Sequence, residues 1–274
     1  MLSARTVLHR DEVILSDVRC SHAKGPATEV ELSPAHAVVF VRRGCFARRV
    51  EGARHILDPT LAYCMNPGQE QCYDHPHDHG DDCTAITLSP ELAASVWGGD
   101  PLLPSGPIST SPQTYLHHRF LLSAARHRHD EHELYESAVM LVAEALEGSD
   151  ARRVAAGGPT RARARRALAD AVREALTEHP DRSLADLART TSTSPHHLSR
   201  VFHAVVGHTI SRHRMRLRTR AALERLGEGE VNLARLAADL GFADQSHLCR
   251  VVRAETGRTP SMLRRALGGE RHTP

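Results

Sequence analysis

Short apolar runs separated by turn-forming residues fill the N-terminal part of the chain, over residues 9–108. Runs such as Ala37–Val41, Ile56–Leu57 and Thr84–Leu88 are divided by glycine, proline and aspartate. Strands of antiparallel sheets are bounded in this way, because a chain that reverses at each strand end needs residues that suit tight turns. The pattern predicts a small antiparallel β fold.

A helical pattern follows at residues 131–146. Its apolar residues recur at spacings of three and four and form one stripe: Leu134, Ala138, Leu141, Val142 and Ala145. An apolar stripe has to be covered in water. Packing within the chain and pairing with the same helix of a second copy both satisfy the pattern, and the second possibility makes this a helical dimerisation segment.

Helical patterning stops at residues 148–159, where small and turn-forming residues collect. We interpret this stretch as a flexible linker. The predicted organisation is therefore an N-terminal region at 1–147, the linker at 148–159, a C-terminal domain at 160–267 and a tail at 268–274.

The C-terminal part repeats itself at an offset of 49 to 50 residues. LADLA at 184–188 matches LARLA at 233–237, and LSRVFHAVVGHT at 198–209 matches LCRVVRAETGRT at 248–259. Each copy predicts a short apolar helix, a tight turn and a second helix. The repeat therefore predicts two helix-turn-helix units.

The second helix of each copy has clear ends. Ser194, which precedes a proline, and Asp244 suit the N-cap position, where a side-chain oxygen accepts a backbone N–H. Gly207 and Gly257 suit the C-terminal stop.

Each second helix has an apolar stripe and a polar stripe. The stripes predicted to be buried are Leu198, Val201, Phe202 and Val205 in the first copy, and Leu248, Val251 and Val252 in the second. Cys249 falls among the displayed residues. The residues predicted to bind DNA are His196, His197, Ser199, Arg200, His203, Gln245, Ser246, His247, Arg250 and Arg253. Such side chains can meet base edges or phosphates when a helix enters a major groove, and the alternative is an ordinary solvated helix face.

An arginine-studded helix is predicted between the copies, at residues 210–226. Seventeen residues at 1.5 Å each make a spacer of about 25 Å. Its arginines at alternate positions spread around the helix, so some are expected to contact phosphate and others to be solvated or structural. Successive major-groove faces recur about every 34 Å along B-DNA. Because the spacer is shorter than this distance, we expect DNA bending as part of recognition.

The net charge of the chain changes sign at the predicted linker, where the helical pattern also stops. Residues 160–267 hold 20 arginines and 11 acidic residues, for a formal charge of +9, whereas the remainder of the 274-residue chain carries −7. A basic region joined to an acidic one is typical of a nucleic-acid-binding domain attached to a domain that avoids nucleic acid. No apolar run approaches the roughly 20 residues that span a membrane, and the N-terminus does not resemble a signal peptide. Together with six scattered cysteines, these features predict a cytoplasmic protein.

The repeat resembles the DNA-binding domain of the AraC/XylS family of bacterial transcription regulators over residues 164–267. The matching segments are SPHHLSRVF, GFADQSHL and TGRTPSMLRR. The resemblance implies base or backbone contacts from His196, Ser199, Arg200, Gln245, Ser246, His247 and Arg250. His213 and Leu263 stand where the family often has aromatic residues, and Arg218 matches a frequent family arginine.

The N-terminal part resembles the cupin-type β-barrel sensor of many such regulators, on HAVVFVRRGCF, the Asn-Pro-Gly at 66–68 and the HP…GDDCT segment. The resemblance implies an α+β chain, with a cupin-like β-barrel, a helical dimerisation segment and an all-α tandem helix-turn-helix domain. Barrel mouths hold small ligands in such folds.

Residues 72–83 have the composition of a metal site. The candidate ligands are Cys72, His75, His77, His79 and Cys83. Pro76 and Gly80 favour a loop, on which these side chains do not share one face. The segment meets the cupin metal pattern only in His75-x-His77, and it misses the ligand motif of metallo-β-lactamase-fold hydrolases by one position. A hydrogen-bonded loop, an effector or pH-responsive site and a metal sensor all stay open.

The sequence thus predicts a transcription regulator, not an enzyme and without a cofactor. Its expected partners are double-stranded promoter DNA, RNA polymerase, a small-molecule effector bound in the N-terminal domain and a second copy in a homodimer, with no membrane. The alternatives are a metal-sensing regulator or metal-dependent enzyme that uses the His75/His77/His79 cluster, and a nucleoid protein without sequence preference.

Overall fold

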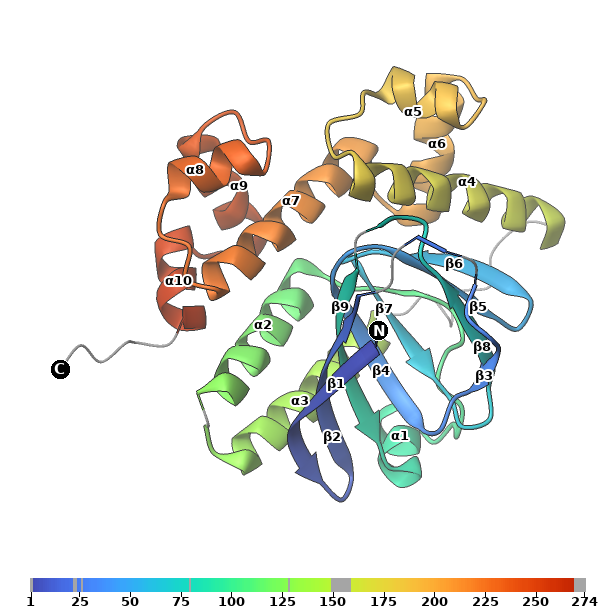
Figure 1. The fold of residues 1–274 in the computed structure, drawn as a ribbon, viewed down its shortest axis with the longest axis vertical. Helices are drawn as coiled ribbons and strands as arrows, with labels where there is room; N and C mark the ends of the chain where they lie inside the picture. The colour runs from blue at the N-terminus through green and yellow to red at the C-terminus, as the bar shows by residue number, and fades with distance from the viewer. Residues whose placement is uncertain are drawn as a thin grey trace.

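The computed structural model describes residues 2–21, 24–25, 27–78, 80–127, 129–148 and 159–268. Within these residues, an N-terminal β structure carries three helices, and seven more helices follow (Figure 1). This arrangement confirms the predicted α+β class, with an antiparallel β fold followed by an all-helical region. No helix among these residues is both long and apolar enough to cross a membrane.

Two antiparallel sheets form the N-terminal part. The six-stranded sheet has the order β1-β2-β9-β4-β7-β10. Its strands are β1 (Leu2–Arg10), β2 (Val13–Cys20), β4 (His36–Arg43), β7 (Leu61–Met65), β9 (Asp81–Leu88) and β10 (Ile108–Ser109). The four-stranded sheet has the order β3-β8-β5-β6. Its strands are β3 (Glu31–Leu32), β5 (Phe46–Val50), β6 (Ala53–Leu57) and β8 (Glu70–Asp74).

The space between the two sheets is filled by side chains. Because successive residues of a strand point to opposite faces, Phe46 of β5 and Tyr63 of β7 meet there while Ala47 lies on the other face. Arg48 shares the interior face, where its guanidinium lies 4.8 Å from the Tyr63 ring. The interior of the barrel is therefore a packed core.

Three helices accompany the sheets. They are α1 (Pro90–Val96), α2 (Pro112–Arg126) and α3 (Glu131–Glu147). The predicted stripe of α3, Leu134 to Ala145, lies in one buried cluster with residues of β2, β4 and β9. Packing within the chain covers the stripe, the first of the two possibilities, so the stripe is not available to pair with a second copy.

The remaining helices form two groups joined by one long helix (Figure 1). They are α4 (Pro159–Glu178), α5 (Leu184–Thr190), α6 (Pro195–Val206), α7 (Ile210–Gly227), α8 (Leu233–Asp239), α9 (Gln245–Thr256) and α10 (Pro260–Gly268). Leu176, Leu187 and Phe202 centre the first group, and Leu236, Leu248 and Leu263 the second. The predicted linker falls on residues 149–158, outside those described, apart from its two ends.

Candidate nucleic-acid interface

The first helix-turn-helix unit consists of α5 and α6. Ser194 accepts a hydrogen bond from the N–H of His197 at 3.2 Å, so α6 begins where the sequence predicts. Gly207 ends it at φ +81°, a conformation that favours glycine. Leu198, Val201 and Phe202 are buried as predicted. Val205 is 37 % exposed, and the next residue, Val206, packs on the core instead, so the prediction for Val205 is wrong.

The second unit, α8 and α9, repeats this construction. Asp244 accepts from the N–H of His247 at 2.6 Å, and Gly257 ends α9 at φ +73°. The turn between the helices requires glycine at 241, because φ is +71° and a Cβ there would lie 2.8 Å from the guanidinium of Arg218. That guanidinium donates to the Gly241 carbonyl and pairs with Asp181. Arg218 therefore has a structural role.

The ten residues predicted to bind DNA lie on α6 and α9. Eight are exposed: His196, His197, Arg200, His203, Gln245, Ser246, Arg250 and Arg253. Ser199 and His247 are half-buried, and the His247 ring nitrogen accepts a hydrogen bond from the Ala243 N–H. Cys249 is half-buried against the second core, so its predicted display is wrong.

The arginines of α6 and α9 differ from those of the connector helix α7 in the contacts that they make. Arg200, Arg250 and Arg253 form no ion pair with any described residue, so their guanidinium groups have all their donors available. On α7, by contrast, Arg216 and Arg220 face the N-terminal part rather than solvent. Arg200, Arg250 and Arg253 are thus free to meet DNA, whereas Arg216 and Arg220 are engaged with the N-terminal part.

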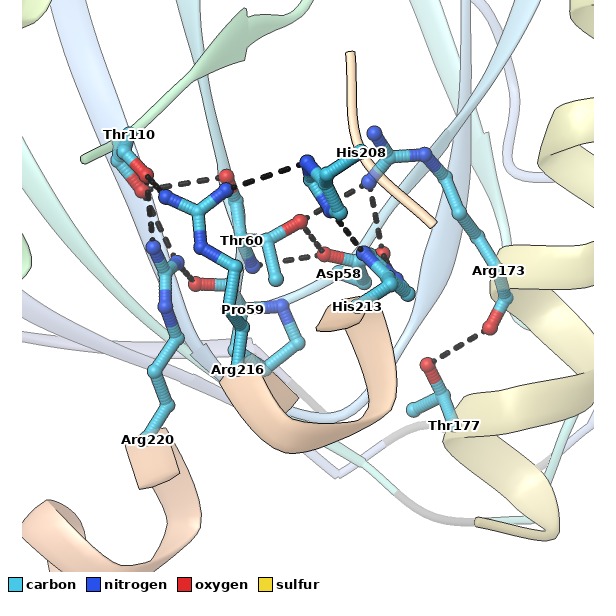
Figure 2. A network of polar contacts seen from close by, with 10 residues as sticks. All are labelled: Asp58, Pro59, Thr60, Thr110, Arg173, Thr177, His208, His213, Arg216 and Arg220. Carbon is cyan, nitrogen blue, oxygen red and sulfur yellow. Dashed lines mark hydrogen bonds and ion pairs between the residues drawn. The ribbon is translucent and has the colours of Figure 1, made fainter. Parts of the chain in front are cut away.

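A buried polar network joins α7 and α4 to the barrel, with Asp58 at its centre (Figure 2). Asp58, in the turn between β6 and β7, is fully buried. Its carboxylate accepts from Arg173 Nη1 at 3.0 Å, lies 3.3 Å from His213 Nε2, and accepts from the Thr60 N–H at 2.7 Å. The His213 ring also packs edge-on against Phe202 of α6, with centroids 5.4 Å apart. One carboxylate of the barrel therefore holds two helices of the first helix-turn-helix group.

The middle of α7 contacts the same edge of the barrel. Arg220 donates to the carbonyls of Pro59 and Thr110, the latter at 2.8 Å, and Arg216 lies 3.4 Å from the Thr110 carbonyl (Figure 2). Arg220 also lies 4.5 Å from the ring of Tyr115 on α2. Burial lowers the pKa of Arg220 to about 9, so it stays charged at neutral pH.

The C-terminal end of α7 is held by a second buried carboxylate. Glu224 forms an ion pair with Arg119 of α2, with Oε2 and Nη1 2.5 Å apart, and lies 3.8 Å from Arg42 of β4, and all three side chains are at most 2 % exposed. Arg42 also pairs with Asp17 of β2. The barrel and α2 thus hold both ends of the connector, an arrangement that the sequence did not indicate.

The histidines of this network make stability depend on pH. Burial lowers the pKa of His208 from 6.5 to about 3, and burial also lowers the pKa of His213 although Asp58 opposes that shift. An unfolded histidine takes up a proton near pH 6.5 whereas these folded ones do not, so stability falls as the pH drops from about 6.5 toward 5. Asp170 acts in the opposite direction, since burial raises its pKa to about 6.

We therefore expect His208→Gln to flatten the pH dependence, because the substitution removes one proton that only the unfolded chain binds. Urea midpoints measured between pH 7.5 and 5 test this. His132→Gln, at an exposed position on α3, is the control and should leave the slope unchanged. Equal slopes for wild type and His208→Gln would contradict the assignment of His208 to this effect.

The predicted metal-ligand set needs correction. Cys72 lies on β8 one position from Tyr73, which faces the interior, so alternation turns Cys72 outward. His77 Nδ1 lies 3.4 Å from Glu178 of α4. Cys83 Sγ lies 3.5 Å from Asp81 Oδ1, whereas it is Oδ2 that faces His75. His79 is outside the described residues. Of the predicted set, His75 alone joins a convergent cluster, with Cys20 and Asp81.

A surface cavity of about 480 Å³ lies at the end of the barrel away from Asp58. Its lining includes Arg49, Glu51, Gln69, Leu102 and Ser105. A volume of this size suits a small organic molecule. The cavity lies on the surface, outside the packed interior.

Comparison with known proteins finds a match for the C-terminal region. A family model described as a helix-turn-helix domain matches residues 187–266. No curated protein matches the chain.

Solved structures also resemble the chain. ToxT from Vibrio cholerae O395 has 12 % identity and a TM-score of 0.37, with 95 % of this chain and 100 % of that chain covered. A structure of unsaturated-fatty-acid-bound ToxT from V. cholerae strain SCE256 has 11 % identity and a TM-score of 0.35, with 93 % and 95 % covered. A cupin superfamily protein from Desulfitobacterium hafniense has 14 % identity and a TM-score of 0.27, with 32 % of this chain and 77 % of that chain covered.

Proposed function

Because residues 187–266 are a helix-turn-helix domain of the AraC type, we propose that this chain is a sequence-specific transcription regulator that reads double-stranded promoter DNA with α6 and α9. The domain type supports DNA binding in general. The particular reading residues, the sequence preference and the control by the N-terminal region are the parts that we propose.

The unpaired donors on two repeated helices carry this proposal. Arg200 on α6 and Arg250 on α9 occupy equivalent positions of the repeat, and both are exposed while the barrel is docked. A guanidinium can donate two parallel hydrogen bonds to guanine O6 and N7, which distinguishes one base pair from the others. The net charge of +9 over residues 160–267 supplies the attraction to phosphate.

We propose that residues 1–147 act as the sensor and residues 160–267 as the DNA-binding domain. The barrel and α2 contact both ends of α7, so a change in the sensor can alter the angle between the two units without covering either reading face. An effector acts in this way only if it binds one arrangement more tightly than the other. The 480 Å³ cavity is the candidate site for a small-molecule effector.

The proposal includes further partners. RNA polymerase and a second copy of the chain are expected at the promoter, in the cytoplasm. Because the apolar stripe of α3 is buried within the chain, a homodimer would use a different surface.

Arg200→Ala and Arg250→Ala are each expected to weaken specific DNA binding by about 1 to 3 kcal/mol, the usual contribution of a bidentate base contact. The measurement is fluorescence anisotropy with a duplex selected from a random library, against random duplex as competitor. Arg5→Ala removes the same charge from an exposed position on β1 and should change affinity little. Unchanged affinity in both test variants would show that Arg200 and Arg250 do not contact bases. Equal affinity of the wild type for selected and random duplexes would contradict sequence specificity.

A further inference from the structure

Three potential metal ligands from distant parts of the sequence converge at one end of the barrel. Cys20 ends β2 and Asp81 begins β9, and the two residues are directly paired across the six-stranded sheet. His75 arrives from the other sheet, immediately after β8. All three residues are buried, and their ligand atoms lie within 4.8 Å of one another.

Cys20 and Asp81 face the same ring nitrogen of His75. His75 Nε2 lies 3.4 Å from Cys20 Sγ and 2.8 Å from Asp81 Oδ2. In a nucleophile–base–carboxylate triad the thiol and the carboxylate contact opposite nitrogens of the imidazole. Here the thiol and the carboxylate instead lie on the same side of the imidazole, so that one ion could reach all three ligand atoms.

Close backbone packing holds these residues in place. A Cβ on Gly80 would lie 2.1 Å from the Cys20 carbonyl oxygen, and a Cβ on Gly44 would lie 2.9 Å from the Asp81 Cα. Only glycine fits at either position. The positions of Cys20 and Asp81 are therefore fixed by tight packing between neighbouring chain segments.

We propose that Cys20, His75 and Asp81 bind a borderline divalent transition-metal ion such as Zn²⁺. Thiolate, imidazole and carboxylate are the ligands that Zn²⁺ accepts. Ligand atoms at bond lengths of about 2.0 to 2.3 Å in a tetrahedron lie roughly 3.3 to 3.7 Å apart. The 3.4 Å between Cys20 and His75 already fits, and the 2.8 Å between His75 and Asp81 has to open by about 0.5 Å.

Binding balances in charge and protons. Cys20 releases its thiol proton to solvent, and His75 gives up the Nε2–H that faces Asp81 and carries its single proton on Nδ1 by exchange with solvent, so that the Nε2 lone pair binds the ion. The thiolate and the carboxylate then carry two negative charges against the two positive charges of the metal. Water completes the fourth position. The ion would tie the two sheets together beside the loop on which His77 contacts Glu178 of α4.

Cobalt substitution tests the site directly and does not depend on DNA binding. Reduced, metal-free protein titrated with Co²⁺ should show a thiolate-to-cobalt charge-transfer band in the near ultraviolet that saturates at one ion per chain, and Zn²⁺ should displace it. Zn²⁺ should also raise the melting temperature of the wild type, because it binds the folded chain. Absence of the band, or saturation only at several ions per chain, would overturn the proposal.

Variants assign the ligands. Cys20→Ser should abolish the near-ultraviolet band. Asp81→Asn preserves the size of the side chain and should weaken Co²⁺ binding by about 100-fold or more. A residue that only hydrogen-bonds to a metal ligand typically costs ~10–100-fold when it is lost, so the larger effect identifies Asp81 as a ligand. Cys72→Ser is the matched control, because Cys72 is the candidate thiol that the structure places outside the cluster, and it should bind like wild type. Circular dichroism of each metal-free variant verifies folding. A band retained in Cys20→Ser but lost in Cys72→Ser would refute the assignment.

Discussion

Asp58→Ala is expected to lower the free energy of unfolding by about 3 to 5 kcal/mol, the cost of leaving a buried partner charge uncompensated. Burial favours the neutral acid, but Arg173 and His213 outweigh it and hold the pKa of Asp58 well below its usual range. Removal of the carboxylate leaves the guanidinium of Arg173, itself 7 % exposed, without its ionic partner. The backbone N–H of Thr60 loses its acceptor as well.

Urea unfolding followed by two probes measures this effect. Trp97 is the single tryptophan of the chain and packs on the core between α3 and the six-stranded sheet, so its fluorescence reports the barrel. Far-ultraviolet circular dichroism reports mainly the helices. We expect the helical transition of Asp58→Ala to move to lower urea more than the fluorescence transition does. Asp11→Ala, at an exposed position in the β1–β2 turn, should stay within about 0.5 kcal/mol of wild type, and a similarly small change in Asp58→Ala would contradict the role assigned to Asp58.

The helix-turn-helix pair was predictable because its determinants are local. Caps at Ser194 and Asp244, glycine stops and apolar spacing within twelve residues define α6 and α9, and the repeat shows the pattern twice. The error at Val205 arises at the last turn of α6, where the chain leaves the core and the next residue, Val206, takes the packing position.

Contacts between distant segments were not predictable in the same way. Asp58-Pro59-Thr60 has the composition of a turn, and nothing local shows that Arg173 and His213, more than 100 residues later, surround it. Cys20 and His75 are 55 residues apart, so composition pointed to the nearer Cys72. For the apolar stripe of α3, the sequence did not distinguish packing within the chain from pairing with a second copy. Periodicity shows that a helix face is apolar, but not what lies against it.

Glu224→Gln is the second large effect that we expect, a loss of about 3 to 5 kcal/mol. The substitution keeps the size of the side chain but removes the charge that faces Arg119 and Arg42, and both guanidinium groups are 1 % exposed. Arg42 retains Asp17, so Arg119 is the group left without an ionic partner. Chemical denaturation measures the loss, and Glu147→Gln, at the exposed end of α3, is the control. A change below about 1 kcal/mol would show that the network does not hold α7 to the barrel.

Combining the two substitutions tests whether α7 docks as one unit. His213, which contacts Asp58, and Glu224 are 11 residues apart on α7, about 16 Å along the axis, and sites so far apart normally have additive effects. If α7 docks all at once, however, losing either carboxylate already releases part of the helix, and the second substitution then costs less. We expect the Asp58→Ala/Glu224→Gln variant to fall short of the summed single losses by more than ~1 kcal/mol, within the range of coupled sites. A strictly additive result would mean that the barrel holds the two helix-turn-helix units independently, and a sensor could then release one without moving the other.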